Sequence, residues 1–143
     1  MSEKARPAYE VIKEKVASSK VVGGDETGIR INGDKAWFWV FQNSLYTFIK
    51  AAYSRGYQSI TETFSDGFPL SIYVSDSLSA QLKTKTLAKQ LCLAHLMREL
   101  KNFEQTFKNE WATRLKQVFK EAIEYKADDN RRLRRGKPES KRI

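Results

Sequence analysis

The sequence feature that most constrains the fold is a tight turn, Asn32-Gly33, between two strand-like runs. Asn-Gly between apolar runs is the strongest short-range signal for a two-residue β-hairpin. The run that follows, residues 36–41, is apolar at every position, which predicts a strand in a sheet that other elements cover on both faces. Trp37 and Trp39 share one face of that strand, and packing in the core is favoured over stacking on nucleic-acid bases.

The rest of the chain predicts a mixed α/β order. Residues 70–75 form a strand that follows a short helix, so this strand should lie parallel to the first one. We expect a helix within residues 1–19, strands at 21–30, 36–41, 45–53, 70–75 and 89–93, short helices near 60–64 and 78–82, and helices from 95 to about 126. Three antiparallel strands, then parallel strands and helices, is the order of a ribonuclease-H-like domain. The predicted fold class is therefore α/β, with a ribonuclease-H-like mixed sheet, flanking helices and a helical C-terminal extension.

Length and composition predict one core with appended segments. With 143 residues, of which 41% are hydrophobic, the chain can bury one sizeable core. We expect an N-terminal helix in residues 1–20, an incomplete ribonuclease-H-like core in 21–95, a helical insertion in 96–127 and a basic disordered tail in 128–143. Disorder is expected of the tail because it is charged and contains almost no apolar residue.

The charge balance favours a polyanionic partner. The sequence holds 26 Lys and Arg against 17 Asp and Glu, a formal net charge of +9. Residues 126–143 contain eight basic and three acidic residues, so they supply +5 of this excess. Such a balance is typical of proteins that bind nucleic acid, although it does not define a fold.

The single cysteine and the absence of long apolar runs indicate a soluble protein. Cys92 is the only cysteine, which excludes an intrachain disulfide and favours a reducing compartment. No run of about 18 apolar residues is present to span a membrane, and residues 1–10 lack the apolar segment of a secretory signal. We therefore expect a cytoplasmic location.

Two aspartates stand within or directly after apolar strands. Asp25 follows two glycines in the first strand, and Asp76 follows the strand at 70–75. A buried carboxylate needs a cation or hydrogen-bond donors, because burial of an unpaired charge is costly. Asp25 could instead be a turn residue, and Asp76 a helix N-cap. If their strands are neighbours about 4.8 Å apart, the two carboxylates converge and can hold Mg²⁺, which prefers oxygen ligands.

Three segments carry a resemblance to a known family. They are GDETGIRINGDKAWFWVFQN at 24–43, YVSDSLSAQLKT at 73–84 and KQLCLAHLMRELKNFE at 89–104. In this order and spacing they closely resemble the central region of transposases of the insertion-sequence sixty-six family. The resemblance implies a DDE transposase with a ribonuclease-H-like catalytic domain. Its acids would bind two Mg²⁺ ions, and the domain would nick the element ends and join the freed 3′-hydroxyl to target DNA.

The resemblance also assigns the acids and exposes a gap. It implies that Asp25 is the first catalytic and metal-binding acid and that Asp76 is the second. Glu26 should point to the opposite face of the strand and is not expected to be a ligand. The family's third acid lies in a run resembling Asn-Asn-x-x-Glu-Arg, which this chain lacks. We therefore expect a truncated copy with an incomplete two-metal Mg²⁺ site and little or no activity alone.

A further element, Cys92 to His95, resembles the C-x-x-H element that many transposases carry after the second acid. Zinc is not expected, because one Cys and one His cannot fill four coordination positions. The favoured interpretation is Cys92 as a small buried group and His95 as an orienting hydrogen bonder; a DNA-proximal role for His95 with Arg98 is the alternative. The other candidate nucleic-acid-binding residues are in the basic tail: Arg131, Arg132, Arg134 and Arg135.

Three functions stay open at this point. The leading hypothesis is a fragment of a transposase catalytic domain, a DDE-type polynucleotidyl transferase without its third carboxylate. The alternative is a non-catalytic remnant that binds nucleic acid or a partner through the basic tail. A compact metal-dependent nuclease that recruits Glu99 or Glu104 is the third. Expected partners are DNA and a second copy or a full-length transposase, since helices of an incomplete fold would leave Trp111 or Phe119 exposed, and the resemblance implies a bacterial, nucleoid-associated location.

Overall fold

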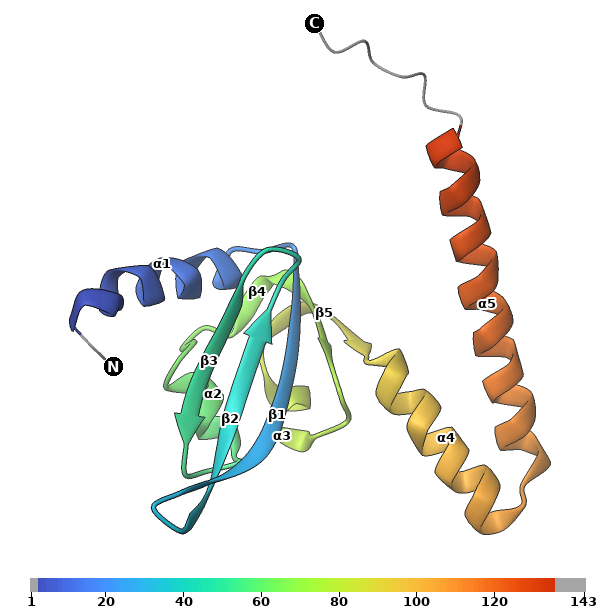
Figure 1. Cartoon of the computed structure of the whole chain (residues 1–143), viewed down its shortest axis with the longest axis horizontal. Helices are drawn as coiled ribbons and strands as arrows, with labels where there is room; N and C mark the ends of the chain where they lie inside the picture. Colours follow the sequence, from blue (N-terminus) through green and yellow to red (C-terminus); the bar gives the residue numbers. More distant parts are fainter. Residues whose placement is uncertain (1–2, 136–143) are drawn as a thin grey trace, which may run out of the picture. The chain divides into compact units, whose positions relative to one another are not determined.

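The computed structural model describes residues 3–135, except the side chains at 130 and 132–135. The chain divides into two compact units, residues 1–93 and 94–143. Figure 1 shows the elements, which are in chain order η1 (Glu3–Ala5), α1 (Arg6–Ala17), β1 (Val21–Ile31), β2 (Asp34–Gln42), β3 (Thr47–Ala52), α2 (Tyr57–Thr61), β4 (Phe68–Ser75), α3 (Ser79–Lys83), β5 (Thr86–Leu91), α4 (Leu93–Phe107) and α5 (Glu110–Arg135).

The first unit contains a five-stranded mixed sheet in the order β3-β2-β1-β4-β5. β1, β2 and β3 form an antiparallel meander, whereas β4 pairs parallel to both β1 and β5. The β1–β2 turn has positive φ angles at Asn32 (52°) and Gly33 (89°), a conformation that Asn and Gly adopt most readily. The predicted hairpin and the parallel fourth strand are therefore confirmed. The mixed α/β architecture is compatible with a ribonuclease-H-like fold.

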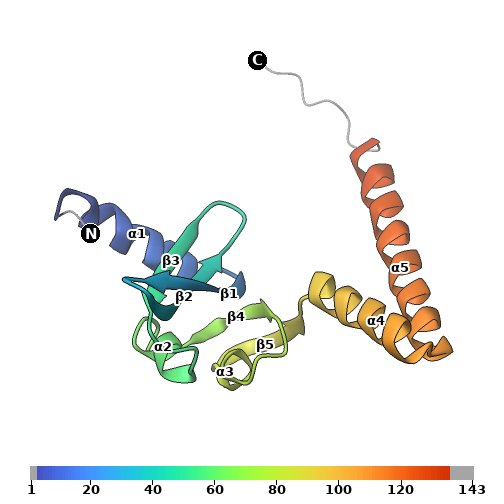
Figure 2. The same cartoon turned by 60° about the horizontal axis from the view of Figure 1, so that its bottom comes forward.

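One face of the sheet carries the core. On this inner face, Trp39 and Phe41 of β2 are fully buried. Their neighbours come from the other central strands and from α1, α2 and α3, and the buried cluster comprises Val16, Val22, Trp39, Phe41, Phe48, Ile60, Phe64, Phe68, Tyr73 and Ala80. Figure 2 shows these short helices beside the strands. Core packing of the predicted Trp pair is confirmed, because Trp37 also packs against this cluster.

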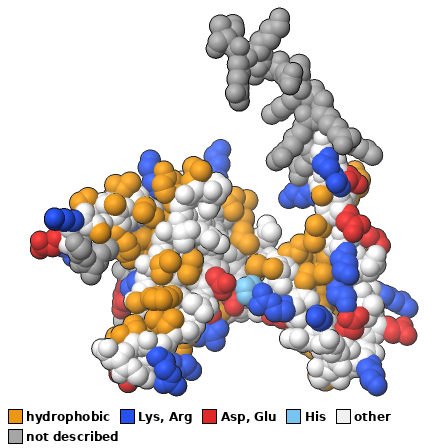
Figure 3. All heavy atoms as spheres, viewed as in Figure 1, with side chains coloured by type: hydrophobic (Ala, Val, Ile, Leu, Met, Phe, Trp, Pro, Cys, Tyr) orange, Lys and Arg blue, Asp and Glu red, His pale blue; other side chains and the backbone are white. Residues whose placement is uncertain are grey.

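The opposite, outer face of the sheet is more open than the sequence predicted. Apolar side chains on this face keep substantial exposure, including Phe38 (39%), Ile49 (47%) and Ile72 (38%). Figure 3 shows hydrophobic side chains on the sheet face that is turned to the viewer. The expectation of cover on both faces is wrong for residues 3–93, because α1, α2 and α3 all contribute to the inner core.

The second unit is a helical hairpin of α4 and α5. Leu100 and Ala112 are buried where the two helices meet, and Phe103 lies 5.9 Å from Trp111 between ring centroids. Glu104 of α4 accepts hydrogen bonds from Thr113 (2.8 Å) and from Lys116 of α5. These contacts join the two amphipathic segments that the sequence predicted. No helix among residues 3–135 is long and apolar enough to cross a membrane.

Several boundaries differ from prediction. The helix predicted near 60–64 lies at 57–61, and the last strand spans residues 86–91 instead of 89–93, because residues 92 and 93 already lead into α4. The disordered tail predicted from residue 128 is wrong for residues 128–135, which continue α5. Adding residues to a helix that has already formed costs little free energy. Asp128 also pairs with Arg131 within residues 128–135. Residues 136–143 lie outside the described part of the chain.

Candidate functional site

Asp25 and Asp76 occupy matching positions on neighbouring parallel strands. The β1–β4 pairing ends with Gly23 opposite Val74, and each aspartate follows two residues later in its own chain segment. Because side chains alternate between faces along a strand, Asp25 lies on the outer face of β1, and Asp76 directly follows the last residue of β4. Both carboxylates also act electrostatically on the hydroxyl of Tyr73. The register therefore places both aspartates just beyond the same end of the β1–β4 pairing.

Each aspartate bonds one local backbone N–H. The Glu26 N–H donates to Asp25 Oδ1 at 2.9 Å, and the Leu78 N–H donates to Asp76 Oδ1 at 2.9 Å. The turn interpretation of Asp25 is wrong, because the residue lies within β1 and pairs with Val40. The N-cap interpretation of Asp76 is wrong too, because Leu78 is the N-cap of α3 and makes no side-chain cap bond.

Tyr73 lies directly behind this acidic pair, on the inner face. Its side chain is 1% exposed, and a Cβ atom at position 24 would overlap the Tyr73 hydroxyl, so Gly24 makes the close approach possible. Burial raises the pKa of this hydroxyl well above its ordinary value, and the negative charges of Glu26, Asp76 and Asp25 add to the effect. Tyr73 is therefore a neutral group that can donate a hydrogen bond, and Gln81 Oε1 lies 3.4 Å from its oxygen.

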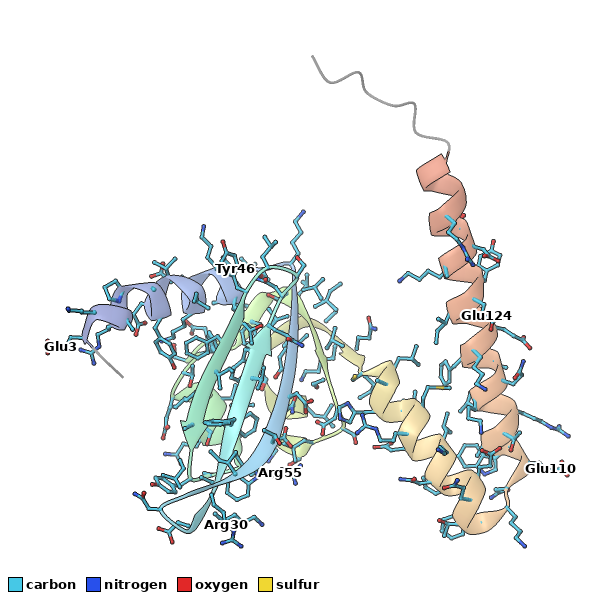
Figure 4. All side chains as sticks on the ribbon, viewed as in Figure 1. Glu3, Arg30, Tyr46, Arg55, Glu110 and Glu124 are labelled. Carbon is cyan, nitrogen blue, oxygen red and sulfur yellow. The ribbon has the colours of Figure 1, made fainter. Side chains whose placement is uncertain are left out.

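Glu26 anchors a polar network on the same inner side. Its side chain is 2% exposed, as expected for a residue that alternates with Asp25 along β1. Arg55 donates from Nε (2.9 Å) and Nη2 (2.6 Å) to Glu26 Oε1, and Gln81 Nε2 donates to Oε2 at 2.5 Å. Figure 4 labels Arg55 beside β1. Sequence reasoning missed Arg55 and Gln81.

The aspartate pair has the donor chemistry of a hard-cation site but few ligands. Carboxylate oxygens suit Mg²⁺ or Mn²⁺. Among residues 3–135, no group of three or more His, Cys, Asp or Glu side chains is placed to hold a metal ion. Asp25 and Asp76 by themselves do not form such a group.

A groove of about 850 Å³ lies at the start of β1, and neither Asp25 nor Asp76 lines it. It opens at the start of β1 and extends to Gly23 and Val74, the outer-face residues two positions before the aspartates. Figure 4 labels Tyr46, one of its lining residues, near the β2–β3 connection. Its other lining residues are Lys15, Ser18, Ser19, Lys20, Val21, Gln42, Asn43, Ser44 and Leu45. Two lysines and several hydroxyl and amide groups make this groove suited to an anionic chain.

The C-x-x-H element is divided between the two units. The Cys92 N–H donates to the Ser75 carbonyl at 2.6 Å, which fixes the half-buried Cys92 one residue from the second aspartate in the β4–β5 region. His95 is half-buried in the first turn of α4. Packing as the role of Cys92 is compatible with this position, and the role of His95 stays a prediction.

The remaining predicted residues lie on the helices. Arg98 is exposed on α4, and Arg131 is exposed on α5, where it pairs with Asp128. Arg132, Arg134 and Arg135 belong to the end of α5, and their side chains lie outside the described part.

Of the two glutamates considered as a replacement acid, Glu104 is engaged elsewhere. Thr113 and Lys116 both donate to its carboxylate within the α4–α5 hairpin. These bonds hold the pKa of Glu104 below its ordinary value. The nuclease hypothesis is weakened for this residue, because recruiting Glu104 to a metal would break the hairpin contact.

Comparison with known proteins identifies the family. A search of curated proteins finds no match. The family model described as Transposase IS66 family matches residues 1–143, the whole chain. This match confirms the resemblance found in the sequence, and the chain belongs to the IS66 transposase family.

Proposed function

We propose that this chain is part of a transposase catalytic domain with a ribonuclease-H-like fold, and that Asp25 and Asp76 are its first and second catalytic acids. The single observation that carries the proposal is the β1–β4 register, which ends at Gly23 opposite Val74 two residues before both aspartates. Membership of a transposase family supports DNA as the substrate. The reaction class is phosphodiester cleavage and transfer.

The two aspartates have distinct supports. Asp25 is held by β1, with β2 paired along its length, so its position depends on the centre of the sheet. Asp76 follows the last residue of β4 and is fixed by its bond to the Leu78 N–H. We assign the second oxygen of each carboxylate to one divalent cation. When bound, such a cation polarises a phosphodiester and activates the attacking oxygen.

The inner-face network keeps these supports in place. Glu26 carries a buried negative charge beside Asp25, and the Arg55 guanidinium offsets it. Tyr73 remains neutral, so it adds no further negative charge behind the pair. Because these groups add no net charge behind the pair, the negative potential on the outer face comes from the two aspartates. This potential favours a cation there.

Two carboxylates do not complete a two-metal site. In phosphodiester displacement, a second ion stabilises the leaving oxygen, and its position needs a further ligand. We therefore propose that this chain alone performs little or no strand transfer.

Calorimetric titration of the full chain with Mg²⁺ and Mn²⁺ tests the proposal. Weak binding to the parent chain should be lost in both Asp25→Asn and Asp76→Asn, because each variant removes half of the carboxylate pair. Asp34→Asn is the matched control, since Asp34 is an exposed acid at the start of β2. Loss of binding in only one aspartate variant, or an equal loss in Asp34→Asn, would contradict a shared site.

A non-catalytic nucleic-acid-binding role is the second candidate, and the groove with Lys15 and Lys20 favours it. The net charge of +9 supports the same role. The basic end of α5, with Arg131, is a separate candidate surface, and Arg98 of α4 another. Binding that depends on phosphate contacts weakens steeply as the salt concentration rises. Each lost contact reduces the magnitude of the negative slope of log K against log salt by about 0.7–0.9.

Self-association, or association with a full-length transposase, is the remaining part of the proposal. The helical unit keeps large apolar side chains exposed, among them Trp111 (48%), Val118 (57%) and Tyr125 (78%). Contiguous apolar surface of this kind is typical of an interaction site. If DNA is the substrate, we also propose that the protein is found with the bacterial nucleoid.

A further inference from the structure

Helix α5 carries two apolar stripes, and α4 covers one of them. The covered stripe contains Ala112, which is fully buried, and Phe119, which is half-buried. Leu100 of α4 is buried opposite this stripe, and the Glu104 bonds to Thr113 and Lys116 run beside it. The second stripe meets α4 at one end, where the ring centroid of Trp111 lies 5.9 Å from that of Phe103.

The second stripe has the spacing of a coiled coil. Its members follow one another at intervals of four, three, four and three residues: Trp111, Leu115, Val118, Ala122 and Tyr125. All five positions are exposed, with Leu115 at 37% and Tyr125 at 78%. Alternating intervals of three and four place every member on one seam of a helix. We call these five residues the heptad stripe.

The lengths of the two helices leave the end of α5 without a neighbour in the hairpin. α4 has 15 residues and α5 has 26. At 1.5 Å per residue they are about 22 Å and about 39 Å long, so α5 extends roughly 17 Å further. Exposed apolar residues continue into this extension, including Ile123 (46%) and Tyr125 (78%). Figure 4 shows the side chains along this helix, with Glu110 and Glu124 labelled.

We propose that the heptad stripe binds the heptad stripe of a second copy of this chain, as a parallel two-stranded coiled coil. With Leu115 and Ala122 at a, and Val118 and Tyr125 at d, the flanking g and e positions hold Glu121 and Lys126. In a parallel pair, a g residue faces the e residue five positions later on the other helix. Glu121 of each copy then faces Lys126 of the other, so both symmetric pairs are attractive.

The inference rests on the self-association part of the proposed function and not on the aspartates. It names the surface, the partner and the orientation of the helices. Metal binding at Asp25 and Asp76 is not required for this contact.

Sedimentation equilibrium of the full chain at 1–100 µM tests the contact. The parent chain should shift from monomer to dimer in this range, and Val118→Glu should remain a monomer throughout. Far-ultraviolet circular dichroism of Val118→Glu should match the parent chain, which excludes unfolding as the cause. A dimer that survives Val118→Glu would overturn the heptad stripe while leaving self-association intact. A parent chain that stays monomeric would overturn both.

Charge reversal tests the orientation without touching the apolar positions. Glu121→Lys and Lys126→Glu should each weaken the dimer about ten-fold, because each creates two like-charge contacts. The double variant should restore the parent dissociation constant. Glu124→Lys is the matched control, since it makes the same charge change as Glu121→Lys at an exposed c position outside the seam and should have no such effect. Failure of the double variant to restore binding would overturn the parallel arrangement.

Discussion

Arg55 donates two hydrogen bonds to the same carboxylate oxygen of Glu26, from Nε at 2.9 Å and from Nη2 at 2.6 Å. The pair is asymmetric, because the Glu26 side chain is 2% exposed and the Arg55 side chain is 51% exposed. Water can therefore replace the contacts of Arg55 but not those of Glu26. This asymmetry decides which substitution is costly.

Arg55→Ala should destabilise the sheet unit by about 2 kcal/mol, because it leaves a buried carboxylate without its cation. Glu26→Gln should cost less, since the neutral amide needs no counter-charge and the arginine can turn to solvent. Urea unfolding followed by tryptophan fluorescence measures both. Arg30→Ala is the control, because Arg30 is an exposed arginine whose bond to the Gly33 carbonyl spans a turn. A larger loss for Glu26→Gln than for Arg55→Ala would contradict this account.

Gly24→Ala should destabilise the chain by roughly 2 kcal/mol, because the new methyl group would overlap the Tyr73 ring and hydroxyl. Gly28→Ala provides a close control on the same strand, since a Cβ there has no heavy atom within 4 Å outside its own neighbours. The difference between the urea unfolding midpoints of the two variants separates the steric overlap with Tyr73 from the effect that replacing glycine by alanine has on the backbone. Equal effects of the two substitutions would show that the close approach of Tyr73 is not the reason for glycine at position 24.

The raised pKa of Tyr73 predicts a loss of stability in alkali. A group whose pKa is raised in the folded state contributes stability that is complete below its unfolded pKa of about 10 and is lost as pH rises above it. The free energy of unfolding should therefore fall between pH 10 and 11.5 in the parent chain. Tyr73→Phe should flatten this fall, because it removes the titrating hydroxyl. An unchanged pH profile in Tyr73→Phe would contradict the burial of a protonated hydroxyl.

The central sheet could be predicted from sequence because its signals are local. Asn32-Gly33 specifies the hairpin by its backbone preferences, and the acid after residues 70–75 marks the end of a parallel strand. The network behind the aspartates could not be predicted in this way. Gln81 is 55 residues from Glu26, and Arg55 is 29 residues away, so nothing in local spacing connects them.

The end of α5 was mispredicted for a different reason. Charged composition predicted disorder from residue 128, but helix formation is cooperative and a packed hairpin supplies the nucleus. The open outer face also differed from expectation. An apolar run such as residues 36–41 indicates that both faces of the strand are covered, but it does not identify the covering element. The metal-binding role of Asp25 and Asp76 stays a prediction.

The lowered pKa of Glu104 predicts an acid transition in the helical hairpin. Hydrogen bonds from Lys116 and Thr113 stabilise the ionised carboxylate, so its contribution is complete above the unfolded pKa of about 4.3 and is lost as pH falls below that value. Helix content of the parent chain, followed by circular dichroism, should decrease below pH 4. Glu104→Gln should reduce helix content already at pH 7 and abolish this acid dependence. Glu110→Gln should behave like the parent, since Glu110 is exposed and pairs only with Arg114 four residues on among the described contacts.

Lys15→Gln with Lys20→Gln should weaken binding of single-stranded DNA if the groove beside β1 follows the phosphate backbone. Loss of two phosphate contacts should reduce the magnitude of the negative slope of log K against log salt by about 1.4. Fluorescence anisotropy of a labelled oligonucleotide between 50 and 200 mM salt measures the slope. Lys4→Gln with Lys35→Gln makes the same charge change at exposed positions outside the groove lining, so its slope should stay near that of the parent chain. Equal slopes for the two double variants would assign the binding to overall charge and remove the groove from the DNA path.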